Sequence, residues 1–182
     1  ARIPVGQSPV QVAVDAAGRY AYVSLAGDKA VAQVDLRRRA VTRTVTVPAA
    51  PVQLFLTPDG TRLLSANQGT ETEPGTTVSV IDVPSLKVSA TITTGSGPHG
   101  VVIDPTGSRA WVTNTYDDTV SVLDLLSNRV VATVPVGDKP NGVTYSARKP
   151  VPGHATMRID VPSYGGAGGA EGHDDDGGHD HG

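Results

Sequence analysis

Short apolar runs, separated by turn-forming residues, follow one another along the third quarter of the chain. They are GVVID (100–104), RAWVTN (109–114), TVSVLD (119–124) and RVVATVPV (129–136), with Gly, Pro, Asn and Asp between them. Alternation with a period of two, bounded by such residues, is typical of half-buried β-strands. No segment of the chain has an apolar stripe at helical spacing. The pattern predicts four consecutive strands and no helix.

The same four-strand pattern occurs twice more, upstream. We expect strands at 11–15, 19–24, 30–35 and 40–47 in the first copy, and at 53–57, 62–67, 77–82 and 87–92 in the second. Three sets of residues keep the register of the copies: Pro9, Pro51, Pro98 and Pro140; Gly18, Gly60 and Gly107; Asp35, Asp82 and Asp124. The prolines are 42, 47 and 42 residues apart, and the five extra residues of the second copy fall within 68–77. A polar surface loop tolerates such an insertion.

A repeat of about 40–45 residues with four short strands has the size of one β-propeller blade. The predicted fold is therefore an all-β propeller of four-stranded antiparallel blades over residues 1–147. The repeats span about 6–47, 48–94 and 95–136, with a partial repeat at 137–147. Residues 148–164 are expected to form an irregular extension.

Several of the repeated motifs resemble the YVTN-type β-propeller repeat. They include YVSL (22–25), LSAN (64–67), WVTN (111–114), VSVID (78–82) and VSVLD (120–124). The resemblance covers about residues 3–147 and implies a bacterial propeller that is exported or attached to the cell surface. It also implies a relationship to the seven-bladed propeller domains of some periplasmic redox enzymes. It does not define a function.

Three blades are fewer than the four to eight of known propellers. RIPV (2–5) matches the end of an outer strand and NGVTYS (141–146) matches an inner strand, so we expect one strand of each flanking blade. The leading interpretation is part of a larger propeller of about seven blades, and the alternative is a dimer that pools blades. Either way the open blade edges would expose apolar side chains and favour self-association.

Composition excludes several classes of protein. The chain of 182 residues has no cysteine, which excludes disulfides, thiol catalysis and Cys-ligated metals. A net charge of −3 argues against a non-specific nucleic-acid binder. No apolar run approaches the length of a transmembrane helix, and the first residues do not read as a signal peptide.

Repetition also decides how the recurrent polar residues are interpreted. An aspartate that ends the third strand of every repeat (Asp35, Asp82 and Asp124) is better explained as a turn former than as a catalytic acid. The glycines of the repeated D-x-x-G or P-x-G turns are expected to adopt positive φ. The run Arg37–Arg39 falls in a turn, where a solvated hairpin tip is favoured over an anion-binding role. We identify no catalytic residues.

His99 is the exception to the repeat. It follows an anchor proline, as Val10, Val52 and Asn141 do, and such positions line the axial channel of a propeller. An imidazole there suits metal ligation or proton transfer, but a single histidine is not a metal site because three or four ligands are needed. A turn-stabilising or channel-lining role is the simpler interpretation.

The last residues, 165–182, contain eight glycines and five acids and no apolar side chain larger than alanine, so we expect them to be disordered. Histidines stand among carboxylates there and together suit copper, zinc or nickel. The candidate ligands are His173, Asp174, Asp176, His179, Asp180 and His181.

The sequence thus favours a non-catalytic binding or scaffold propeller with a metal-binding tail and a protein, glycan or small-molecule ligand at its loops. The YVTN resemblance implies a location outside the cytoplasm. The alternative is part of a periplasmic redox or metal-dependent enzyme that uses His99. The identity of the ligand and of the metal does not follow from the sequence.

Overall fold

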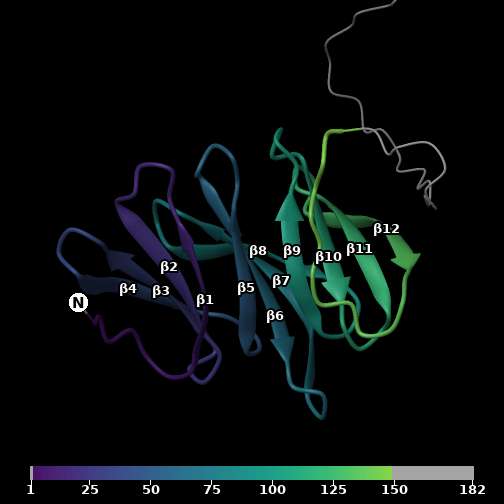
Figure 1. Cartoon of the computed structure of the whole chain (residues 1–182), viewed down its shortest axis with the longest axis horizontal. Helices are drawn as coiled ribbons and strands as arrows, with labels where there is room; N and C mark the ends of the chain where they lie inside the picture. The colour runs from purple at the N-terminus through teal and green to yellow at the C-terminus, as the bar shows by residue number, and fades with distance from the viewer. Residues whose placement is uncertain (1, 149–182) are drawn as a thin grey trace, which may run out of the picture.

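Three four-stranded antiparallel sheets make up the computed structural model, which describes residues 2–148 (Figure 1). Residues 2–148 contain no helix, and hence none that is long and apolar enough to cross a membrane. The first sheet consists of β1 (Pro9–Val14), β2 (Tyr20–Leu25), β3 (Ala30–Asp35) and β4 (Ala40–Thr46). The second consists of β5 (Pro51–Leu56), β6 (Arg62–Gly69), β7 (Pro74–Asp82) and β8 (Lys87–Thr93). The third consists of β9 (Pro98–Ile103), β10 (Arg109–Asn114), β11 (Thr119–Asp124) and β12 (Arg129–Pro135).

Within each sheet the strands lie in chain order, so every strand pairs with its neighbours in the sequence. The first strands of the three sheets lie next to one another, β1 beside β5 and β5 beside β9. The sheets therefore stand side by side as the blades of a propeller do, with β1, β5 and β9 as inner strands (Figure 1). The prediction of three four-stranded antiparallel sheets is confirmed.

The strand ends differ from the expected ones in an informative way. Each inner strand begins at its anchor proline, two residues earlier than expected, because the proline pairs with the end of the second strand, as Pro51 does with Asn67. A proline is tolerated there because an inner strand has a partner on one side only. The insertion of the second copy is mostly strand: β6 and β7 continue their pairing to Gly69 and Pro74. The loop expected at 68–77 is thus a longer hairpin.

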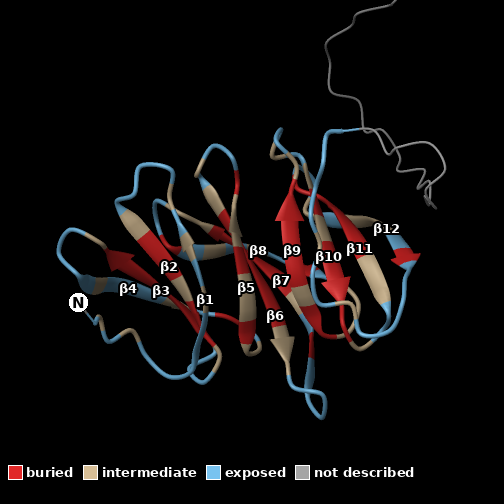
Figure 2. Cartoon of the chain, in the orientation of Figure 1, coloured by how far each residue is buried: buried red, intermediate tan, exposed pale blue. Residues whose placement is uncertain are grey.

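The buried residues lie mainly on the strands of the three sheets (Figure 2), and the apolar ones form two clusters, each between neighbouring sheets. One cluster joins the first two sheets around Tyr22, Val31 and Leu54, and the other joins the second and third around Leu64 and Val101. Ordinary burial energetics, about 25 cal/mol per Å² of apolar surface, make these contacts the main source of stability between sheets.

The first sheet shows how far a neighbouring sheet buries the side chains of an inner strand. Val12 of β1 is 53% exposed, whereas Leu54 and Val101, at the same position of β5 and β9, are 1% and 0% exposed. The preceding sheet covers Leu54 and Val101, and residues 2–148 provide no such sheet for Val12. Val12 and Val14 of β1 therefore form an exposed apolar edge.

The prediction of a strand at each flank was wrong. Residues 2–5 and 141–146 are extended but belong to no sheet, because neither finds a strand among residues 2–148 with which to pair. Residues 141–146 nevertheless cover the third sheet, where the Tyr145 ring lies 5.5 Å from the Trp111 ring, measured between centroids. The C-terminal side of the third sheet is therefore only partly exposed.

Candidate functional site

A pocket of about 320 Å³ lies where the inner strands begin. Residues at the same repeat positions line it, one set from each inner strand and one from the segment after β12: Val10, Gln11, Val52, Gln53, His99, Asn141, Gly142 and Val143. All four residues that follow an anchor proline are among them, so the structure brings together the positions expected at the channel. We call this cavity the inner-strand pocket.

Glutamine side chains join one inner strand to the next beside this pocket. The Gln11 side-chain oxygen accepts a hydrogen bond of 2.9 Å from the Leu54 backbone N–H, and the Gln53 oxygen accepts one of 2.7 Å from the Val101 N–H. The edge of an inner strand has no partner strand, so its backbone N–H groups need side-chain acceptors. The two glutamines supply these acceptors. Sequence analysis missed this role, although glutamine recurs two residues after Pro9 and Pro51.

The third sheet replaces glutamine by Gly100, and the chain passes closer there. A Cβ atom at Gly100 would lie 2.8 Å from the Asn141 carbonyl oxygen and 3.0 Å from Thr113 Oγ1. The Gly100 N–H donates to Thr113 Oγ1 at 2.7 Å, and Thr115 Oγ1 donates to the Pro140 carbonyl at 2.8 Å. The Thr115 hydroxyl thus binds the segment at Pro140 and Asn141, which passes close to Gly100 of β9 and forms the fourth wall of the pocket.

His99 has a defined tautomer in this arrangement. Its Nδ1 lies 2.7 Å from the Asn141 carbonyl oxygen. A carbonyl only accepts, so Nδ1 carries the proton and neutral His99 keeps a lone pair on Nε2. His99 therefore offers one acceptor or one ligand nitrogen to the inner-strand pocket.

The remaining lining is neutral. His99 is the only titratable residue of the pocket wall, and three valines provide apolar surface beside the Gln and Asn amides. Within residues 2–148 no group of three or more His, Asp, Glu or Cys side chains is placed to hold a metal ion. The pocket suits a small ligand with an apolar body and a few hydrogen-bonding groups.

The repeated aspartates accept hydrogen bonds within the turns that follow the third strands. Asp35, Asp82 and Asp124 each accept a hydrogen bond from the backbone N–H three residues later, and Ser85 and Ser127 add their hydroxyls. Bonds from Ser85 lower the pKa of Asp82, and bonds chiefly from the Ser127 N–H lower that of Asp124. Gly18, Gly60 and Gly107 adopt φ of 62°, 69° and 72°. The structural interpretation of both sets is confirmed.

A buried polar network on two sheets also escaped sequence analysis. The Asn114 side-chain nitrogen donates to Thr119 Oγ1 at 2.9 Å and to Ser121 Oγ at 2.8 Å, and Asn67 makes the same pair of bonds to Thr77 and Ser79. Both asparagines are fully buried. In the first sheet the corresponding residues are Leu25, Ala30 and Ala32, so the polar set is replaced as a whole by an apolar one. These asparagines are structural.

A second pocket, of about 470 Å³, lies against the inserted hairpin. Its wall includes Glu71, Asp118, Asp138 and Lys139, and Lys139 Nζ is 3.0 Å from Glu71 Oε1. The Glu71 carboxylate raises the pKa of Lys139. The pair ties the hairpin of the second sheet to the segment after β12.

The tail residues that sequence analysis selected as metal ligands, His173, Asp174, Asp176, His179, Asp180 and His181, lie outside the described residues. So do the expected extension from residue 149 onward and the expected disordered segment 165–182.

Many solved structures match this fold, including the following two. Hydrazine synthase from Kuenenia stuttgartiensis matches with a TM-score of 0.65 and 26% identity, over 70% of this chain and 37% of that one. A putative 6-phosphogluconolactonase from Bacteroides fragilis NCTC 9343 matches with a TM-score of 0.65 and 18% identity, over 78% of this chain and 43% of that one. This chain thus spans about two fifths of the length of each. No protein-family model and no curated protein matches the chain.

Proposed function

We propose that this chain is a non-catalytic β-propeller of the YVTN type that binds a small ligand, or a side chain of a partner protein, in the inner-strand pocket. The observation that supports the proposal most directly is the convergence on one cavity of residues from all three inner strands and from the segment at Asn141. The repeated sheets would then form a rigid scaffold, and the few residues in which the three copies differ would determine which ligand binds.

In the pocket wall the copies differ at the position after the anchor proline, which is valine in two sheets and histidine in the third. His99 gives the pocket an acceptor, and its hydrogen bond to the Asn141 carbonyl fixes the ring. Val10, Val52 and Val143 favour an apolar body. We therefore expect a ligand that is largely uncharged and donates a hydrogen bond to His99 Nε2.

A fluorinated fragment library screened by ¹⁹F NMR tests this proposal on the whole chain. We expect hits that are lost in Val52→Lys, which fills the pocket, and retained in Val136→Lys, which adds the same charge at an exposed valine outside the pocket wall. Hits that survive Val52→Lys, or no hits at all at millimolar fragment concentration, would contradict a ligand site there.

A second candidate is a redox or metal-dependent propeller enzyme in which Nε2 of His99 is a metal ligand. The bond from Nδ1 to a carbonyl favours it, because metal-ligating histidines usually donate their other ring nitrogen in this way. The other ligands would have to come from outside residues 2–148. Loss of stoichiometric Zn(II) or Cu(II) binding in His99→Ala, with fragment binding unchanged, would favour this candidate over the first.

The exposed apolar edge of β1 suits a further propeller blade, since a blade covers the same positions of β5 and β9. We further propose an extracytoplasmic location, on the YVTN resemblance alone, and a metal-binding role for the histidines and acids of residues 171–182, on composition.

A further inference from the structure

Three arginines from two separate turns of the first sheet surround a cavity of about 630 Å³. Arg19 belongs to the turn between β1 and β2, and Arg37 and Arg38 belong to the turn between β3 and β4. β1 and β3 run in the same direction, so both turns lie at the end of the sheet opposite the inner-strand pocket. We call this cavity the arginine cavity.

The repeat shows that the fold does not require these arginines. Ser108, Leu126 and Ser127 occupy the three positions in the third sheet, and Thr61, Pro84 and Ser85 occupy them in the second. Both other sheets form the same turns with these neutral residues. Three arginines in the first sheet alone therefore need an explanation other than turn formation.

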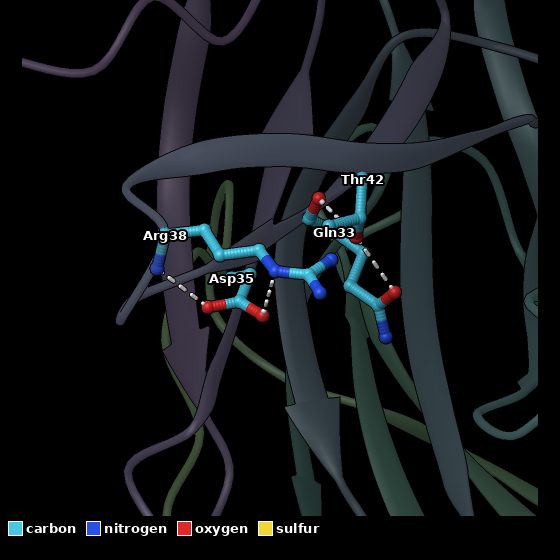
Figure 3. Close-up of polar contacts among 4 residues, drawn as sticks. All are labelled: Gln33, Asp35, Arg38 and Thr42. Carbon is cyan, nitrogen blue, oxygen red and sulfur yellow. Dashed lines mark hydrogen bonds and ion pairs between the residues drawn. The ribbon is translucent and has the colours of Figure 1, made fainter.

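The only acid of the cavity wall is already bound by the turn. Asp35 is buried, and its Oδ1 accepts the Arg38 N–H at 2.8 Å. The Arg38 Nε lies 3.9 Å from Asp35 Oδ2, and the terminal nitrogens of that guanidinium extend past the carboxylate (Figure 3). The Arg38 side chain is 78% exposed, so this contact leaves most of its donors to solvent.

Arg19 and Arg37 do not form even the long ion pair that Arg38 forms with Asp35. The Arg19 guanidinium stacks 4.9 Å above the Tyr20 ring, and neither it nor Arg37 bonds to an acid within residues 2–148. Three guanidinium groups against one carboxylate leave a local charge of about +2 at the cavity wall. A second carboxylate, that of Asp15, lies in the turn of Arg19 but accepts the backbone N–H groups of Arg19 and Tyr20 and is not part of the cavity wall. The positive charge of the cavity wall favours binding of an anion.

We propose that the arginine cavity binds a phosphomonoester group carried by a small molecule. Guanidinium forks pair with tetrahedral oxyanions through parallel N–H···O bonds, which suits planar donors approaching from two turns. A phosphomonoester carries about −1.5 to −2 charges at pH 7, close to the charge of the cavity, whereas a sulfate monoester or a carboxylate carries −1. The cavity volume is in the range of small-molecule sites.

Titration of the ¹⁵N-labelled chain with phenyl phosphate at fixed ionic strength tests the proposal through the arginine Nε–H signals. The wild type is expected to show saturable shifts of the Arg19 and Arg38 signals at millimolar phenyl phosphate. The variant Arg19→Ser/Arg38→Ser carries the residues of the third sheet, so it should fold, and its affinity should fall about tenfold or more. Circular dichroism and thermal unfolding check the fold of each variant.

The matched control is Arg39→Asn, which removes one charge from the same turn outside the cavity wall and also copies the third sheet, where Asn128 stands. We expect its affinity to stay within about twofold of the wild type. Phenyl sulfate and benzoate should bind more weakly than phenyl phosphate, and inorganic phosphate should compete. Absence of saturable shifts in the wild type, an equal loss in Arg39→Asn, or equal affinity for benzoate would each overturn the proposal.

Discussion

The Gln53 side-chain oxygen on β5 accepts a 2.7 Å hydrogen bond from the backbone N–H of Val101 on β9. Val101 is fully buried in the cluster between the second and third sheets. The bond therefore crosses from one sheet to the next at their inner edge, where no strand-to-strand ladder exists.

Replacement of Gln53 by Met keeps the length of the side chain and removes the acceptor. The buried Val101 N–H then lacks a partner, so we expect the free energy of unfolding to fall by about 1–3 kcal/mol in urea denaturation. The control Gln7→Met alters an exposed glutamine and should change the free energy of unfolding by less than about 0.5 kcal/mol. Equal values for the two variants would contradict the assigned role of Gln53.

The first sheet provides a template for repairing a substitution at Asn114. Asn114→Leu leaves Thr119 Oγ1 and Ser121 Oγ without their donor, and we expect a loss of about 2–4 kcal/mol in the free energy of unfolding. The triple variant Asn114→Leu/Thr119→Ala/Ser121→Ala copies Leu25, Ala30 and Ala32 and should recover more than half of it. A triple variant no more stable than the single one would show that the network is not exchangeable as a unit.

Acid should weaken the turn at Asp59. Hydrogen bonds from the Thr57 hydroxyl, and then from the Thr61 N–H and hydroxyl, lower the pKa of Asp59 to about 2. The contribution is therefore complete above the unfolded-state pKa near 4 and disappears as the pH falls toward 2. Asp59→Asn should be less stable than the wild type at pH 7, by under about 1 kcal/mol because the carboxylate is solvent-exposed, and equally stable near pH 2. A difference that is independent of pH would refute this assignment.

The exposed edge of β1 should make the chain associate. We expect light scattering to show a mass that rises with protein concentration, and Val12→Asp/Val14→Asp to abolish that rise without loss of the fold, since both side chains are exposed. The same double change at Leu54 and Leu56 should unfold the protein, because Leu54 is buried. A wild type that stays monomeric at all concentrations would eliminate self-association through this edge.

The tail should take up Cu(II), Ni(II) or Zn(II) through His173, His179 and His181, with affinity falling as the pH drops through about 6.5, where imidazole protonates. Isothermal titration of the full chain and of one ending at Tyr164 measures this directly. Equal uptake by both would eliminate the tail as the ligand and leave His99, and His154 of the expected extension (148–164), as candidates.

The strands could be predicted because each sheet uses side-chain alternation and turn residues that are local in the sequence, as in TVSVLD (119–124). The role of Gln53 could not, because its partner Val101 is 48 residues away and only the packing of two sheets defines their distance. The same holds for the arginine cavity: Arg37 and Arg38 were noticed as a run, but Arg19 joins them only through the pairing of β2 with β3, which places Tyr20 opposite Asp35. At residues 2–5 and 141–146 the sequence predicted strands that the structure lacks, since a strand-like sequence forms no strand without a partner.

The chain-order pairing within each sheet also bears on how the protein folds. Every hairpin closes a short loop, so each sheet can form at a small entropic cost before it meets its neighbours, and folding should proceed sheet by sheet. The second sheet is packed on both sides, whereas the first and third have one sheet neighbour each within residues 2–148. In native-state hydrogen exchange the amides of β6 and β7 should therefore open last, and those of β1 and β4 first.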